Sequence, residues 1–199
     1  MLVLKEAGYE VVSVYLTKGE AGIVGKSHAE SAAIRVEEAT CASQMLGARP
    51  VFMTQIDGNT EINKERYVEM RELIAAEKPD VVFTHWPIDS HADHRVCSLL
   101  VYDAWRRLGY NFELYYFEVM SGMQTTLFHP TDYVDISKVP TASARHAIAT
   151  RVRTWTVCMI GTARWNASAA WSSIASVQRR SSICGGLTVI CWGEVFRGN

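Results

Sequence analysis

The densest group of chemically active side chains lies in residues 85–94, where three histidines and two aspartates occur within ten residues. Histidine is the commonest metal ligand and the usual acid–base group near neutral pH. A neighbouring carboxylate can orient the ring and favour its protonated form. The cluster therefore predicts a metal site or an acid–base site. The alternative is a polar loop in which Asp89 or Ser90 caps the next helix. His91 and His94 share a helix face if that helix begins early.

A second candidate is the glycine-rich segment 17–25. Its glycines allow the backbone to approach a ligand closely, and Glu20 could accept hydrogen bonds from sugar hydroxyls. The segment lacks the glycine patterns of dinucleotide and phosphate loops, so a plain turn is an equal alternative. Arg35 is either a contact for an anionic or hydroxylated substrate or a partner of Glu38.

The elements that must position these residues alternate between strand and helix. In segment 27–46, helical spacing can place six side chains on a single face: Ala32, Ala33, Val36, Ala39, Ala42 and Met45. In segment 61–77, the same spacing points four side chains inward: Tyr67, Met70, Leu73 and Ile74. Alternation at this spacing predicts an α/β fold, a Rossmann-like, mostly parallel sheet with helices on both faces. Ligands of such sheets bind beyond the carboxyl ends of the strands. The predicted strands are 10–16, 50–56, 80–84 and 113–119, and the predicted helices are 2–8, 27–46, 61–77 and 94–108.

The composition excludes several classes of protein. A formal net charge of −1 argues against a nucleic-acid binder that works through a basic surface. No apolar run is long enough for a membrane span, and the N-terminus is charged too early for a signal peptide. The five cysteines are odd in number and form no C-x-x-C pair, which argues against a zinc ribbon or a disulfide framework. We therefore expect a cytoplasmic protein.

The average charge hides a sharp change along the chain. Residues 1–140 hold 20 acidic and 13 basic side chains, a net charge of −7. Residues 141–199 hold one acidic side chain and seven arginines, a net charge of +6, together with four of the six tryptophans. A tryptophan- and arginine-rich surface for membrane or nucleic acid is one interpretation. However, these residues show no amphipathic period.

Four segments of the chain resemble the LmbE-like (PIG-L) family of zinc-dependent N-acetyl-sugar deacetylases, in family order over residues 2–137. They are EVVSVYLTKGEAG, the helix that carries RVEEA, DVVFTHWPIDSHADH and FHPTDYVDIS. The resemblance implies a zinc cofactor and a small N-acetylated sugar as substrate. By position in the motif, His94 is similar to a metal ligand and His91 to the acid that stabilises the oxyanion or protonates the leaving amine. Asp93 is similar to the carboxylate that supports this acid, and Glu20 and Arg35 become candidate substrate contacts.

The chain departs from the family pattern at both ends. It contains no His-Pro-Asp-Asp motif, which in the family supplies two metal ligands and the general base after the first strand. We therefore expect residues 1–138 to form an N-terminally truncated domain. Its first strand would be missing, its sheet would lack a central element, and its zinc site would be incomplete. Residues 139–199 are expected to be an aberrant tail.

Two other functions stay open beside deacetylation. A metal-dependent phosphohydrolase is one, because H-x-D-H also suits binuclear centres. A non-catalytic, sugar-binding or degenerate family member is the other. The identity of the sugar and self-association into a homo-oligomer also stay open.

A shift of reading frame near residue 139 would explain the tail. Read one base back, the codon of Thr156 after Trp155 must encode Asp, and so must that of Ile160 after Met159. We predict that the coding DNA downstream of this point continues the family pattern in another frame. An intact frame with no such continuation would contradict the hypothesis.

Overall fold

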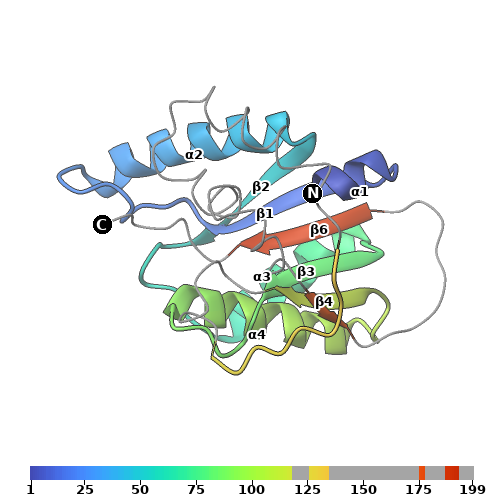
Figure 1. Cartoon of the computed structure of the whole chain (residues 1–199). Helices are drawn as coiled ribbons and strands as arrows, with labels where there is room; N and C mark the ends of the chain where they lie inside the picture. Colours follow the sequence, from blue (N-terminus) through green and yellow to red (C-terminus); the bar gives the residue numbers. More distant parts are fainter. Residues whose placement is uncertain (118–125, 135–174, 178–186, 193–199) are drawn as a thin grey trace.

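The computed structural model describes residues 1–117, 126–134, 175–177 and 187–192 (Figure 1). Most of the predicted tail, with the reading-frame hypothesis and the tryptophan and arginine side chains, lies outside the described residues. The described helices are α1 (Leu2–Glu6), α2 (His28–Met45), α3 (Lys64–Glu77) and α4 (Ala92–Arg107). The strands are β1 (Glu10–Thr17), β2 (Ala48–Gln55), β3 (Val81–His85), β4 (Glu113–Phe117), β5 (Ala175–Val177) and β6 (Leu187–Trp192).

The strands form one sheet in the order β2-β1-β6-β3-β4-β5. All neighbours are parallel except β4 and β5. The predicted α/β class and mostly parallel sheet are therefore confirmed. None of the described helices is both long and apolar enough to cross a membrane.

The middle of the sheet is occupied by β6, which comes from the predicted tail. Its backbone pairs with β1 from Glu10↔Leu187 to Tyr15↔Trp192, and with β3 from Val81↔Thr188 to Phe83↔Ile190. The sequence predicts a sheet without a central strand, but the described sheet is continuous because β6 fills that place (Figure 1). The boundary between a domain at 1–138 and a tail at 139–199 stays a prediction.

Helices cover both faces of the sheet, as Figure 1 shows. Side chains along β1 alternate between the faces, because successive residues of a strand point to opposite sides. Val12, Val14 and Leu16 pack in the main core, which also takes Met70 from α3 and Leu100 from α4. Val11 belongs to a smaller cluster on the other face with residues of α1.

The buried face of α3 agrees with its predicted one, whereas that of α2 agrees only in part. Met70 and Ile74 are fully buried, and Tyr67 and Leu73 pack against the same core. In α2 the fully buried residues are Ser31, Arg35, Ala39 and Ser43. Of the predicted face Ala39 is among them, most of the others are half-buried and Ala33 is exposed. Polar residues join this interface because it holds polar partners: the Tyr15 hydroxyl lies 3.0 Å from Ser43 Oγ.

Removing β6 should disrupt the fold. In the described sheet, β1 and β2 connect to β3 and β4 only through this strand. We expect a chain that ends at residue 186 to lose cooperative thermal unfolding measured by circular dichroism. A chain that ends at residue 192 keeps every described strand pair and is the control. Equal melting transitions for the two chains would contradict the role of β6.

Candidate metal centre

The predicted histidine cluster lies where β3 ends and α4 begins. The last residue of β3 is His85, and α4 starts at Ala92, so His91 is its N-cap and His94 lies in its first turn. The helix begins two residues earlier than predicted, and this early start brings both histidines to the edge of the sheet. The loops after β1 and β2 reach the same edge, because β1, β2 and β3 run parallel in one sheet.

Three buried side chains form a group that could hold a metal ion: His85, Asp89 and His94. We call these three residues the metal group. Their candidate ligand atoms all lie within 4.8 Å of one another. The His94 Nδ1 lies 3.0 Å from Asp89 Oδ2, and the rings of His85 and His94 stack with centroids 3.8 Å apart. Two imidazoles and one carboxylate are a donor set found in catalytic zinc sites. The donor chemistry therefore fits a divalent transition metal.

Local hydrogen bonds explain the fold of the loop that carries this group. Asp89 Oδ1 accepts a hydrogen bond from the His91 backbone N–H at 2.7 Å, which closes a turn. Arg95 Nη1 donates to the carbonyl oxygens of Asp89 and Ser90, at 2.7 and 2.9 Å. The loop is thus held on both sides, and the Asp89 carboxylate faces His94.

The electrostatics of His85 suit a metal ligand. Burial lowers the pKa of His85 well below its ordinary value, and the nearby charges of His94 and His91 lower it further. A neutral imidazole has a lone pair for a metal, whereas a protonated one does not. His85 is therefore neutral near pH 7 and ready to coordinate.

His91 lies beside this group but is only half-buried. Its ring centroid is 4.8 Å from that of His94. Its Nδ1 accepts a hydrogen bond from the Asp93 backbone N–H at 3.2 Å, which caps α4. In the neutral ring the proton then sits on Nε2. His91 is thus placed to present an Nε2–H near the metal group.

Asp93 is buried and connects the cluster to the loop after β2. Its carboxylate accepts hydrogen bonds from the Gly58 backbone N–H at 2.8 Å and from Thr60 Oγ1 at 2.6 Å. Toward His91, Asp93 contributes the backbone N–H that caps the helix. This geometry makes Asp93 an anchor between two loops, and its predicted support of His91 stays a prediction.

Glu20 joins the loops after β1 and β2. Its Oε2 accepts hydrogen bonds from the backbone N–H groups of Lys18 and Asp57, at 3.2 and 3.1 Å. Asp57 Oδ2 in return accepts one from the Ala21 N–H at 3.1 Å. The two carboxylates thus cross-link the loops, and a contact of Glu20 with substrate stays a prediction.

Arg35 lies beneath the glycine loop and is only 3% exposed. It forms an ion pair with Glu38 at 3.1 Å, which was one of its two predicted roles. A Cβ atom placed on Gly19 would lie 3.2 Å from the Cβ of Arg35, and Gly19 has a φ of +71°. The loop therefore needs glycine at this position. Substrate binding by Arg35 stays a prediction.

The sequence pattern identified His94 as a candidate ligand but missed His85 and Asp89 in this role. His85 is the last residue of β3, where an inward-facing side chain reaches the carboxyl edge of the sheet. The spacing His85-x-x-x-Asp89-x-x-x-x-His94 was the available signal. That spacing brings the three side chains together only because the intervening loop turns back. The residue pattern alone does not predict this path of the loop.

Comparison with known proteins identifies the family. The sequence model of the PIG-L family, described as GlcNAc-PI de-N-acetylase, matches residues 1–105. The chain belongs to the PIG-L family. Family membership supports a hydrolase of the deacetylase type. A search of curated proteins gives no match.

Solved structures share the fold. One is the 4-carboxy-2-hydroxymuconate hydratase GalB from Pseudomonas putida, with a TM-score of 0.67, 19% identity, 92% of this chain and 89% of that chain covered. Another is the N,N'-diacetylchitobiose deacetylase from Pyrococcus horikoshii, with a TM-score of 0.62 and 23% identity. The match covers 73% of this chain and 60% of the deacetylase chain. A third is the A40926 pseudoaglycone deacetylase Dbv21, with a TM-score of 0.58 and 18% identity. The match covers 92% of this chain and 91% of the Dbv21 chain. At these identities the likeness establishes the fold alone.

We expect the metal group to retain zinc through its histidines. Substituting His85→Ala or His94→Ala should weaken zinc binding by more than about 100-fold, because loss even of a residue that only orients a ligand costs about 10- to 100-fold. Zinc per chain is measured by atomic spectroscopy after dialysis of the zinc-loaded protein.

The matched control is His28→Ala, because His28 is exposed at the start of α2. This variant should retain zinc like the unaltered chain. Equal retention in all three variants would show that the buried group does not hold the metal.

Proposed function

We propose that this protein is a zinc-dependent hydrolase that removes the acetyl group from an N-acetylglucosamine-type sugar or glycoconjugate. The observation that carries this proposal is the buried group of His85, Asp89 and His94 beside the half-buried His91. Two imidazoles and a carboxylate match zinc, and membership in the PIG-L family supports amide hydrolysis. The substrate is a small molecule, and zinc is the cofactor.

The reaction breaks the amide C–N bond, joins a water oxygen to the carbonyl carbon, and releases acetate and the sugar amine. When bound, zinc supplies a Lewis acid for the carbonyl oxygen and activates water for attack. The proton lost by the attacking water ends on the amine that leaves, so the overall reaction is balanced in protons. Asp89 accepts hydrogen bonds in the loop and lies against His94, so it holds the ligand set in place.

The protein's own acid in this scheme is His91. Its Nδ1 accepts the Asp93 backbone N–H in the cap of α4, so a neutral ring would stabilise the developing oxyanion through its Nε2–H, whereas protonation of the departing amine would require the imidazolium form. Asp93 assists by fixing the first turn of α4 against the loop after β2. An imidazolium at this position would let the amine leave as a neutral group.

Glu20 and Arg35 are proposed to aid substrate binding. They either contact the sugar hydroxyls or hold the loop that does so. Both side chains are buried, at 7% and 3% exposure, and both shape the glycine loop after β1. That loop lies at the edge of the sheet that carries the metal group. Its backbone can therefore contact the sugar while the two side chains hold it in place.

The role of His91 can be separated from that of the metal ligands. His91→Asn retains a side-chain acceptor for the cap of α4 but has no transferable proton. We expect this variant to keep its zinc and to lose turnover by about 100-fold or more. Acetate release from N-acetylglucosamine derivatives is the measurement, and zinc content is the control.

Unchanged turnover in His91→Asn would contradict the acid role. Hydrolysis of a phosphate ester with no acetate release would favour a metal-dependent phosphohydrolase instead. A purified chain that binds the sugar but retains no zinc would favour a non-catalytic sugar-binding protein.

A further inference from the structure

An exposed aliphatic rim lies beside the loop that carries the metal group. We define this rim as Ile88 and Leu127. Ile88 directly precedes Asp89 and is 47% exposed, and Leu127 is 69% exposed. Single exposed aliphatic residues are common on proteins, so exposure alone decides nothing. The attachment of the Leu127 segment to the metal-bearing loop is what distinguishes this rim.

Leu127 is held against the metal-bearing loop from both sides. The Thr126 backbone N–H donates to the Ile88 carbonyl at 3.1 Å, and the Trp86 indole N–H donates to the Thr126 carbonyl at 2.9 Å. On the other side, the ring of Phe128 packs edge-on against Trp86 with centroids 5.4 Å apart. Trp86 is the residue after His85. The residues on either side of Leu127 thus contact Trp86 and Ile88, which belong to the loop that carries the metal group.

The backbone of Leu127 is strained. Its φ is +58°, in the left-handed region that leucine rarely adopts because its Cβ would crowd the following carbonyl oxygen. Asparagine or glycine would suit this conformation better. A strained residue whose side chain is mostly exposed gains little from packing within the chain. Such outliers concentrate at ligand-binding positions.

The geometry points to Leu127 and Ile88 as a contact for an apolar group on the substrate. This inference rests on the proposed function, since it places an alkyl or aromatic substituent of an N-acyl amino sugar on the rim while the amide lies at the metal group. The substituent can sit on the acyl side or on the aglycone side of the sugar. Either source offers the same chemistry to the rim.

Three probes separate these sources: methyl N-acetyl-β-glucosaminide, its hexyl glycoside, and methyl N-hexanoyl-β-glucosaminide. Their dissociation constants for the zinc-loaded full chain are measured by calorimetry, and turnover is followed by release of the free amine. We expect one of the two hexyl-bearing probes to bind about tenfold more tightly than the methyl probe, as burial of one or two methylene groups would give. The probe that shows the preference identifies the source.

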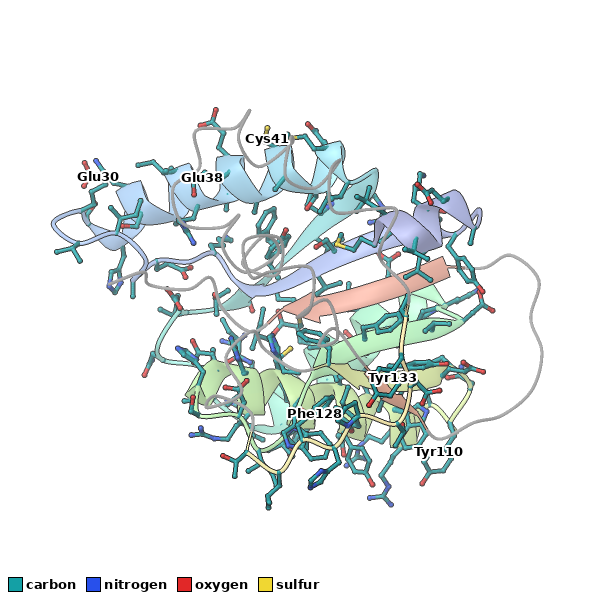
Figure 2. All side chains as sticks on the ribbon, viewed as in Figure 1. Glu30, Glu38, Cys41, Tyr110, Phe128 and Tyr133 are labelled. Carbon is teal, nitrogen blue, oxygen red and sulfur yellow. The ribbon has the colours of Figure 1, made fainter. Side chains whose placement is uncertain are left out.

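The decisive variant is Leu127→Asn, which suits the left-handed backbone and removes the aliphatic side chain. Its preference for the hexyl-bearing probe should fall to within about twofold, because the lost contact is worth roughly the burial of a methylene or two. The matched control is Tyr110→Asn, because Tyr110 also has a φ of +58° and is exposed. It lies beyond the far end of α4, whose 16 residues span about 24 Å (Figure 2). This control should keep the full preference.

Equal affinities for all three probes in the unaltered chain, or an undiminished preference in Leu127→Asn, would overturn the inference. The proposed function can fail separately. If no amine is released but the preference depends on Leu127, the rim stands and the deacetylase proposal falls. If amine is released from the methyl probe without any preference, the deacetylase stands and the rim falls.

Discussion

Parallel pairing of β1 and β3 with the same central strand, β6, is the constraint on which the rest of this structure depends. Parallel strands end at one edge, so their loops meet there. The metal group lies at the end of β3 and the start of α4. Asp93 of α4 joins this region to the loop after β2, and Glu20 and Asp57 join that loop to the one after β1. The two halves of the described sheet have β6 as their common partner. A segment far along the chain thus holds together an edge built by residues from its first half.

Buried carboxylates stabilise that edge because each one accepts hydrogen bonds from the backbone. Glu20, Asp57 and Asp93 accept backbone N–H groups from loops other than their own. A buried carboxylate without donors would be strongly unfavourable, so these bonds fix the relative positions of the loops. Asp89 differs, since it faces His94 as well as the backbone N–H of its own turn. Glu20, Asp57 and Asp93 therefore anchor the loops, whereas Asp89 is the carboxylate that could bind a metal ion.

The loop between β3 and α4 carries several of the proposed site residues within a few positions. His85 and Asp89 belong to the candidate metal group, and His91 caps the helix beside it. Trp86 and Ile88, two of the three residues between His85 and Asp89, hold the segment around Leu127. The proposed reacting groups and part of the proposed substrate contact therefore share one short segment, whose geometry is set by Arg95 and by the first turn of α4.

The sequence by itself determined the α/β class, the family and the position of the histidine cluster, because these follow from local periodicity and from motif spacing. The buried face of α3 also followed from helical spacing, since Met70 and Ile74 are apolar. The face of α2 followed only in part, because Ser43 and Arg35 are buried by partners on other elements that no local pattern contains. Only the tertiary structure brought His85 and Asp89 to His94, and only it placed β6 in the middle of the sheet. Both depend on contacts between residues distant in sequence or on the path of a loop, and neither is encoded in the spacing of side chains.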